Sequence, residues 1–215
     1  MRYSGDIKIC GLSTIEAVDA VIAGGATHAG FIFFAKSPRH LSVGLAAQLS
    51  NRANAGGLKT VAVTVDATDE ELAEIVEIMR PNIIQLHGHE TAQRAAEIKA
   101  RYHLPVMKAL AISEVADFEK LTPFFGIADR FLLDAKPPKD AVLPGGNAVS
   151  FDWTLLKHLA ENVDYLLAGG LDAGNVKEAI TIANPLGLDI SSGVESAPGI
   201  KDVGKIAAFL KAARS

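Results

Sequence analysis

Two side chains that can exchange protons stand at the ends of short apolar runs that are far apart in the chain. Cys10 lies near the end of residues 7–11, and Asp134 ends residues 130–134. A thiol and a carboxyl group can serve as a general base and a general acid. A lone cysteine is more often a small buried hydrophobic residue, and an aspartate before a loop often only caps it. Their positions in the fold therefore decide between the two interpretations.

Two stretches late in the chain each run from a short apolar segment into a turn of small residues. They span residues 163–171 and 188–196. The small residues that matter are Gly169, Gly170, Ser191, Ser192 and Gly193. Such residues let backbone N–H groups approach an oxyanion closely, because little or no side chain stands in the way. Together the two stretches predict a phosphate-binding cradle, although a Gly-Gly pair alone more often marks a simple turn.

Apolar runs alternate with helical patterns along all 215 residues. The expected strands are 7–11, 27–34, 60–65, 82–86, 105–110, 130–134, 163–171 and 188–196, the last two including their turns. The expected helices are one that Ser13 caps and Gly24 stops, then 45–53, 69–79, 91–102, 114–121, 153–159, 175–183 and 203–213. A short extra helix is expected at 195–197. Pro123 and Gly126 leave the helix at 114–121 weakly defined.

This alternation predicts the fold class. Repeated strand–helix units imply a parallel sheet with right-handed crossovers, and eight units close readily into a barrel. We therefore expect an α/β fold, a single-domain (β/α)8 TIM barrel over residues 1–215, with a phosphate-binding site at the C-terminal ends of its strands. An open, doubly wound sheet is the structural alternative.

In such a barrel the chemistry lies at the C-terminal ends of the strands. Strand side chains alternate, so Lys8 shares a face with Cys10, and Gln85 shares a face with His87. We expect these faces, and that of Asp134, to point into the barrel. Strands one and six would be separated only by the two strands that carry the cradle. The thiol and the carboxyl group should therefore bracket a phosphorylated ligand.

The segment 135–149 carries three prolines and two glycines and no clear periodicity. An irregular loop of this length in a compact domain is usually functional, often a lid over a site. It follows the strand that ends at Asp134. We therefore expect it at the mouth of the predicted site.

Composition excludes several classes of function. A net charge of −4 offers no basic surface for nucleic acid. No apolar run approaches the ~18 residues of a membrane span, and the charged start of the chain lacks the apolar core of a signal peptide. We therefore expect a cytoplasmic protein with a small-molecule substrate. The one cysteine and the scattered histidines suggest no metal site.

The candidate motifs, taken in order, resemble those of the phosphoribosylanthranilate isomerase family. They are Lys8-Ile9-Cys10-Gly11, Ser37-Pro38-Arg39-His40, Gln85-Leu86-His87-Gly88, Leu132-Leu133-Asp134, 167–171 and 189–195, followed by Lys201-Asp202. The similarity runs from residue 8 to residue 202 and is more specific than any single motif. Residues 61–65 match loosely, because a phenylalanine is common near the end of that strand in the family.

The resemblance implies a cofactor-free aldose–ketose isomerase of tryptophan biosynthesis. Its reaction is an Amadori rearrangement of N-(5-phosphoribosyl)anthranilate to 1-(2-carboxyphenylamino)-1-deoxyribulose 5-phosphate. By similarity, Asp134 is the general acid at the ring oxygen, Cys10 is the base that takes the C2 proton, and Arg39 binds the anthranilate carboxylate. The other residues implied in substrate binding are Gln85, His87, Gly169, Gly170, Asp189, Ser191, Ser192 and Gly193.

These roles require help from the surroundings. A free thiol with a pKa near ~8.5 is only slightly ionised at neutral pH, and Lys8 is one possible source of activation. An acid role for Asp134 requires partial burial, because a solvated aspartate loses its proton near pH ~4.

Alternative functions remain open from the sequence. One is another sugar-phosphate isomerase or epimerase, such as the histidine-pathway aminoaldose isomerase, although that enzyme pairs two aspartates where this chain has Cys10 and Asp134. Another is a barrel that binds a phosphorylated ligand without turnover. The sequence is compatible with either a monomer or a homodimer.

Overall fold

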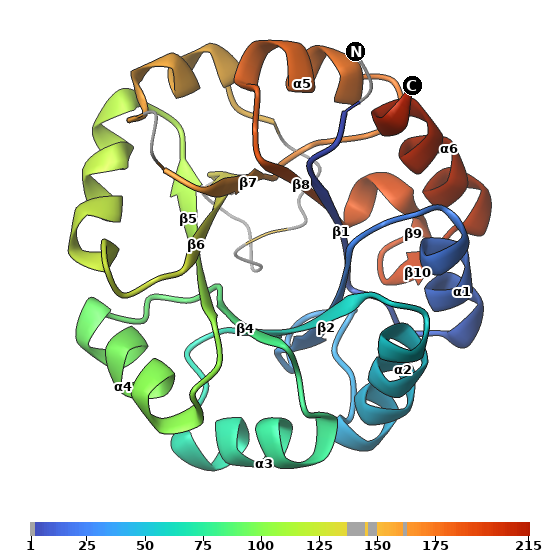
Figure 1. Cartoon of the computed structure of the whole chain (residues 1–215), viewed down its shortest axis with the longest axis vertical. Coiled ribbons are helices and arrows are strands. Elements are labelled where there is room, and N and C mark those ends of the chain that lie inside the picture. Colours follow the sequence, from blue (N-terminus) through green and yellow to red (C-terminus); the bar gives the residue numbers. More distant parts are fainter. Residues whose placement is uncertain (1–2, 137–144, 146–149, 161–162) are drawn as a thin grey trace.

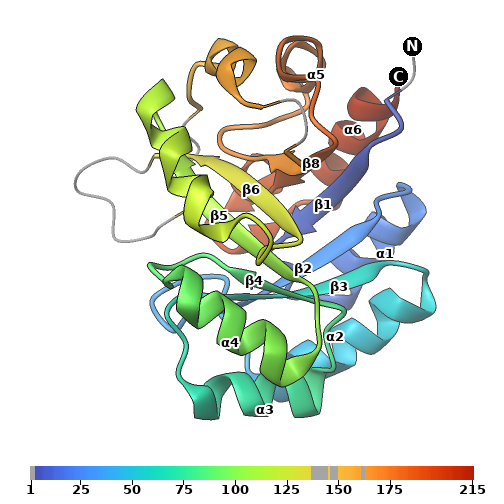
Figure 2. The same cartoon turned by 60° about the vertical axis from the view of Figure 1, so that its left-hand side comes forward.

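Eight parallel strands close into a barrel in the computed structural model, which describes residues 3–136, 145, 150–160 and 163–215 (Figures 1 and 2). The strands are β1 (Asp6–Cys10), β2 (His28–Phe33), β3 (Lys59–Thr64), β4 (Ile83–Leu86), β5 (Val106–Ile112), β6 (Arg130–Ala135), β7 (Tyr165–Leu167) and β8 (Gly187–Ile190). They pair in chain order, and β8 closes onto β1 through pairs such as Lys8 with Asp189. The predicted (β/α)8 barrel is confirmed, and the open-sheet alternative is wrong.

Helices surround the barrel and connect its strands (Figure 1). The α-helices are α1 (Ile15–Ala23), α2 (Val43–Ala55), α3 (Asp69–Met79), α4 (Ala92–Tyr102), α5 (Val176–Ala183) and α6 (Val203–Arg214). The 3₁₀ helices are η1 (Val115–Phe124), η2 (Trp153–His158) and η3 (Ser192–Val194). A two-stranded antiparallel ribbon, β9 (Glu195–Ala197) with β10 (Ile200–Lys201), precedes α6.

Some local predictions were wrong. The helices expected at 114–121 and 153–159 are 3₁₀ rather than α-helical, and η1 contains Pro123, which lacks an N–H donor for an α-helical hydrogen bond. Thr14, not Ser13, caps α1, since its side chain accepts a hydrogen bond from the Ala17 amide. The short helix is Ser192–Val194, whereas Glu195–Ala197 is extended and pairs with β10.

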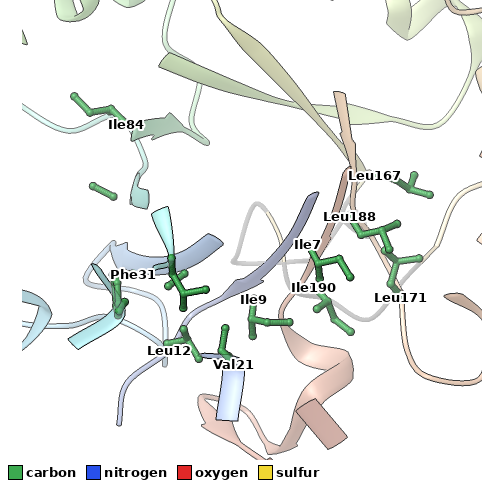
Figure 3. Close-up of a cluster of buried hydrophobic side chains, with 14 of the residues drawn as sticks. Ile7, Ile9, Leu12, Val21, Phe31, Ile84, Leu167, Leu171, Leu188 and Ile190 are labelled. Carbon is green, nitrogen blue, oxygen red and sulfur yellow. The ribbon is translucent and has the colours of Figure 1, made fainter. Parts of the chain in front are cut away.

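Alternation along the strands produces two apolar layers. The outward side chains, including Ile7, Ile9, Phe31 and Leu188, pack beneath the helices in the large core cluster (Figure 3). The inward side chains form two smaller clusters inside the barrel. These are Met107, Ala109, Leu132, Leu166 and Ala168 on one side and Cys10, Val61 and Val63 on the other. The outward side chains thus form the main core, and the inward side chains at the strand ends can contribute to a site.

Most of the predicted lid, residues 135–149, lies outside the described residues. The exceptions are Ala135, Lys136 and Gly145. Within the described residues, none of the helices has the length and apolarity needed to span a bilayer.

Candidate active site

A cavity opens where the C-terminal ends of the strands converge, and the predicted site residues line it. They are Cys10, Arg39, His87, Asp134, Gly169, Gly170, Asp189, Ser191, Ser192 and Gly193. Gln85 is the exception. It is fully buried and does not border the cavity, so the structure favours a supporting role for Gln85 over the direct substrate contact that we predicted.

Cys10 and Asp134 come from β1 and β6, and β7 and β8 separate these strands in the barrel. Both side chains line the cavity, with exposed fractions of 5% for Cys10 and 8% for Asp134. Asp134 is therefore largely buried at the end of its strand. A ligand held on the β7–β8 side has a thiol on one flank and a carboxyl group on the other.

Lys8 lies beneath Cys10 on the same inward face. Its ammonium Nζ is 2.6 Å from Oδ1 of Asp189 on β8, and the side chain is completely buried. Burial by itself would lower the pKa of Lys8, but Asp189 raises it above the ordinary value, so the ammonium stays charged. Burial raises the pKa of the Cys10 thiol, an effect that Lys8 opposes and Asp189 reinforces.

Asp134 is held by its own backbone and faces a histidine. Its Oδ1 accepts a hydrogen bond from the Ala135 amide at 2.8 Å, and Oδ2 lies 3.5 Å from Nε2 of His87. Gln85 reaches the other ring nitrogen, with Nε2 2.9 Å from Nδ1 of His87. An amide N–H donated to Nδ1 leaves the proton of a neutral ring on Nε2, directed at Asp134. Gln85 thereby orients the imidazole.

A buried ion pair fixes the loop that carries His87. Nζ of Lys108 on β5 lies 2.7 Å from Oε2 of Glu90 and 2.8 Å from the carbonyl oxygen of Gly88. Oε1 of Glu90 in turn accepts hydrogen bonds from the amides of Asp66 and Gly88 at 3.0 and 3.1 Å. The loop after β4 is thus tied to both neighbouring strands. Sequence reasoning gave Lys108 and Glu90 no role.

Gly145, one of the described residues of the segment 135–149, lines the cavity. A Cβ on this residue would stand 2.8 Å from Oδ2 of Asp134 and 2.9 Å from Nε2 of His87. The Gly145 backbone therefore lies close to both side chains, and a larger residue would require one of them to shift.

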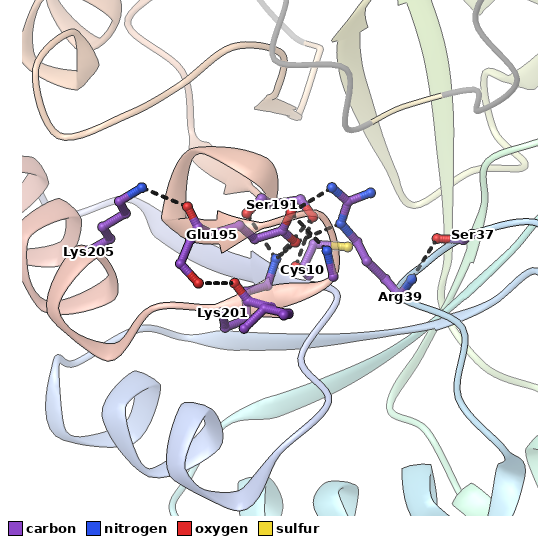
Figure 4. Close-up of polar contacts among 10 residues, drawn as sticks. Cys10, Ser37, Arg39, Ser191, Glu195, Lys201 and Lys205 are labelled. Carbon is purple, nitrogen blue, oxygen red and sulfur yellow. Dashed lines mark hydrogen bonds and ion pairs between the residues drawn. The ribbon is translucent and has the colours of Figure 1, made fainter.

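Arg39 is anchored by a carboxylate that sequence reasoning also missed. Its Nε and Nη2 donate to Oε1 and Oε2 of Glu195 at 2.7 and 2.8 Å, a bidentate pair buried beside the cavity (Figure 4). Lys201 donates to the same Oε1 at 2.7 Å. Burial alone would raise the pKa of Glu195, but Arg39 and Lys201 hold it below the ordinary value. Arg39 and Glu195 both stand in the motifs that carry the family resemblance, yet nothing in the sequence revealed that they pair.

This network reaches Cys10 through Ser191. Lys201 donates to the Ser191 carbonyl oxygen at 2.9 Å, and the Ser191 hydroxyl donates to the carbonyl oxygen of Cys10 at 3.1 Å. Among the described residues, Nη1 of Arg39 donates no hydrogen bond. The planar guanidinium is therefore fixed on one edge, and its remaining donor is available to an anion in the cavity.

The turns after β7 and β8 supply free backbone donors. Within the described part of the chain, the N–H groups of Gly170, Ser192 and Gly193 make no hydrogen bond, and all three residues line the cavity. Gly170 has a φ of 63°, which favours glycine. A Cβ on Gly193 would stand 2.0 Å from the Leu171 carbonyl oxygen, so the two turns touch. Unpaired N–H groups that border one cavity suit a phosphate.

Gly193→Ala is expected to weaken phosphate binding by about 10- to 100-fold, because the added Cβ must separate the two turns and each lost charge-assisted bond contributes ~1.5 to 3 kcal/mol. Isothermal titration with inorganic phosphate measures the effect. Gly44→Ala is the matched control, since that position has open space around it. Unchanged phosphate affinity in Gly193→Ala would remove the cradle from this account.

Comparison with known proteins agrees with this geometry. The family model of N-(5'-phosphoribosyl)anthranilate isomerase matches residues 7–212. The N-(5'-phosphoribosyl)anthranilate isomerase of Mesorhizobium japonicum is 59% identical over 210 residues, covering 98% of this chain and 95% of that protein.

The chain belongs to the phosphoribosylanthranilate isomerase family.

Solved structures of this family share the fold. The Thermotoga maritima enzyme superposes with a TM-score of 0.85 at 31% identity, covering 97% of this chain and 98% of the other. A phosphoribosylanthranilate isomerase in complex with reduced 1-(o-carboxyphenylamino)-1-deoxyribulose 5-phosphate has a TM-score of 0.82 at 30% identity, with the same coverage. A member of the family therefore holds a ligand with a carboxylate, an aromatic ring and a phosphate.

Proposed function

We propose that this protein is the phosphoribosylanthranilate isomerase of tryptophan biosynthesis, with Cys10 as general base and Asp134 as general acid. The observation that carries the proposal is the placement of these two groups on opposite flanks of a cavity. The β7–β8 side of this cavity offers backbone N–H donors that have no partner among the described residues. The reaction is an intramolecular aldose–ketose isomerisation. Its proton transfers are assigned to side chains of this chain, so the proposal includes no cofactor.

Three parts of the cavity suit three parts of the substrate. The phosphate lies at Gly170, Ser192 and Gly193, whose N–H groups make no hydrogen bond to other described residues. The anthranilate carboxylate lies at Arg39. The apolar side chains of Ile32, Phe34 and Val65 line the same cavity and offer a surface for the aromatic ring. The sugar then spans the space between Cys10 and Asp134.

Ring opening is the acid step. Asp134 donates a proton to the ring oxygen as the C1–O bond breaks, and the electron pair of that bond stays on the oxygen, which becomes a hydroxyl group. The nitrogen lone pair forms the C1=N double bond, leaving an iminium ion. The Ala135 amide holds the carboxyl group in place for this transfer, and Nε2 of His87 lies 3.5 Å from its other oxygen.

Proton removal at C2 is the base step. The Cys10 thiolate takes the C2 proton and becomes a thiol, and the electron pair of the C–H bond forms the C1=C2 double bond. The π electrons of the iminium return to nitrogen, which gives an enolamine. Addition of a proton at C1 and loss of the hydroxyl proton at C2 then yield the aminoketose.

Arg39→Lys is expected to weaken a product analogue that carries the anthranilate carboxylate by ~1.5 to 3 kcal/mol, because an ammonium cannot hold Glu195 bidentately and still present a donor to the cavity. Lysine keeps the charge beside Glu195, so the fold is retained. The comparison is with the decarboxylated analogue, whose affinity should change little. Equal losses for both ligands would assign Arg39 to loop positioning alone.

A fluorescence assay tests the proposed activity. Purified protein added to phosphoribosylanthranilate should cause loss of the anthranilate-type fluorescence without added metal or cofactor. The histidine-pathway aminoaldose should be a poor substrate, since that reaction in the related enzyme uses an aspartate where Cys10 stands here. Binding of the phosphorylated ligand with no fluorescence change would favour the non-catalytic barrel.

Location and assembly belong to the proposal as well. We infer a cytoplasmic enzyme from its place in amino-acid biosynthesis. The phosphoribosylanthranilate isomerase of Thermotoga maritima is dimeric, and monomers of it have also been crystallised. Either state fits this chain, and analytical ultracentrifugation distinguishes them.

A further inference from the structure

The ammonium of Lys8 lies between two groups that both attract it. One is Asp189, whose Oδ1 is 2.6 Å from Nζ. The other is Cys10, two residues along the same inward face of β1. Its thiol pKa is raised by burial and by Asp189 but lowered by Lys8 and, further away, by Lys201. Inside the barrel, one ammonium therefore interacts with both the Asp189 carboxylate and the Cys10 thiol.

The neighbouring strand is shaped to bring Lys8 and Cys10 together. Gly30 on β2 pairs with Cys10 in register. A Cβ on Gly30 would lie 3.0 Å from Sγ of Cys10 and 3.1 Å from Cε of Lys8. The space in front of this glycine is thus filled by the sulfur and by the end of the lysine side chain, so the two groups share one small volume.

Asp189 has a second carboxylate oxygen, and the residue lines the cavity. Among the described residues, Oδ1 is held by Lys8 whereas Oδ2 takes part in no hydrogen bond. Asp189 also lines the cavity between Cys10 and the cradle at Ser192. A sugar whose phosphate occupies the cradle can donate a hydrogen bond from a hydroxyl group to this oxygen.

We propose that Asp189 and Cys10 share the Lys8 ammonium, and that a sugar hydroxyl donated to Asp189 shifts the ammonium toward the sulfur, so that ligand binding itself prepares the thiolate. Lys8 is then a positioning residue that acts through Cys10. In the step, the S–H bond breaks, the electron pair stays on sulfur, and the proton leaves to water at the cavity mouth. The inference rests on the proposed function for the kind of ligand.

The single cysteine makes this measurable. Protein labelled with ¹³C at the cysteine β carbon gives one resonance whose chemical shift follows ionisation of Cys10. The titration midpoint is compared for free protein, with inorganic phosphate, and with ribitol 5-phosphate. Ribitol 5-phosphate should lower the midpoint by about one pH unit, a tenfold change in thiolate fraction. Inorganic phosphate, which has no sugar hydroxyl, should not lower it.

Variants separate the two partners of Lys8. Asp189→Asn should lower the midpoint in the free protein and abolish the response to ribitol 5-phosphate, because the competing charge is gone. Adding Lys8→Met to Asp189→Asn should raise the midpoint again, and this double variant leaves no unpaired charge buried. Asp19 is an exposed carboxylate that pairs with Arg52, and Asp19→Asn is the control. In this variant Cys10 should titrate as it does in the parent.

A Cys10 titration midpoint in Asp189→Asn equal to that of the parent overturns the inference. Failure of ribitol 5-phosphate to bind, or binding that does not lower the midpoint, also overturns it. These outcomes are independent of turnover. A parent that shows the expected titrations but does not consume phosphoribosylanthranilate would refute the proposed function and leave the shared ammonium intact.

Discussion

Cys10→Ala is expected to lower kcat by about 10²- to 10⁴-fold while leaving the affinity for inorganic phosphate nearly unchanged, because a general base contributes that much to rate and the cradle is built from other residues. The measurement pairs steady-state kinetics on phosphoribosylanthranilate with phosphate titration. Binding and chemistry should separate.

The alternative for Cys10 is packing, since it belongs to an interior cluster with Val61 and Val63. Val61→Ala is therefore the matched control. Val61 is fully buried in the same cluster but does not border the cavity. If the thiol only fills space, Cys10→Ala and Val61→Ala should both reduce stability and both keep kcat within a few-fold of the parent. Near-parent turnover in Cys10→Ala would mean that the base must be sought elsewhere.

Asp134→Asn is expected to lower kcat by a similar factor, about 10²- to 10⁴-fold, because an amide cannot donate a proton to the ring oxygen and be left as a stable anion. The substitution preserves shape, and the amide oxygen can still accept from the Ala135 amide as Oδ1 now does. Stability and phosphate affinity should therefore change little.

The control for Asp134→Asn is a carboxylate outside the cavity. Asp19→Asn should leave kcat and KM at parent values, since Asp19 is paired with Arg52 on the surface. If Asp134→Asn instead lost phosphate affinity in proportion to kcat, the carboxylate would be shaping the pocket, and its assignment as the acid would fail.

The barrel could be predicted because its signal is local and repeated. Each strand is a short apolar run, and the polar side chains Lys8, Cys10 and Asp134 interrupt the inward face of their strands. Once the strands close in chain order, the position of Cys10 across from Asp134 follows from topology alone. The small residues after β7 and β8 indicated two turns at the same end of the barrel, and residues of both turns line the cavity.

The sequence could not reveal the ion pairs between residues that are far apart in the chain. Arg39 and Glu195 are 156 positions apart, and Lys8 and Asp189 are 181 apart. No periodicity encodes these pairs, because they arise only when β1 and β8 meet and the ribbon before α6 folds back. Gln85, for which we predicted a substrate contact, shares a face with His87. Its side chain contacts the imidazole and does not line the cavity.

The most direct test of the central claim, that Cys10 and Asp134 act at different steps, is the kinetic isotope effect on kcat with phosphoribosylanthranilate deuterated at sugar C2. Removal of the base makes C–H cleavage limiting, so Cys10→Ala should show a large isotope effect. Loss of the acid makes ring opening limiting, so Asp134→Asn should show an effect near unity. Equal isotope effects in the two variants, or a larger one in Asp134→Asn, would contradict the assignment of base and acid.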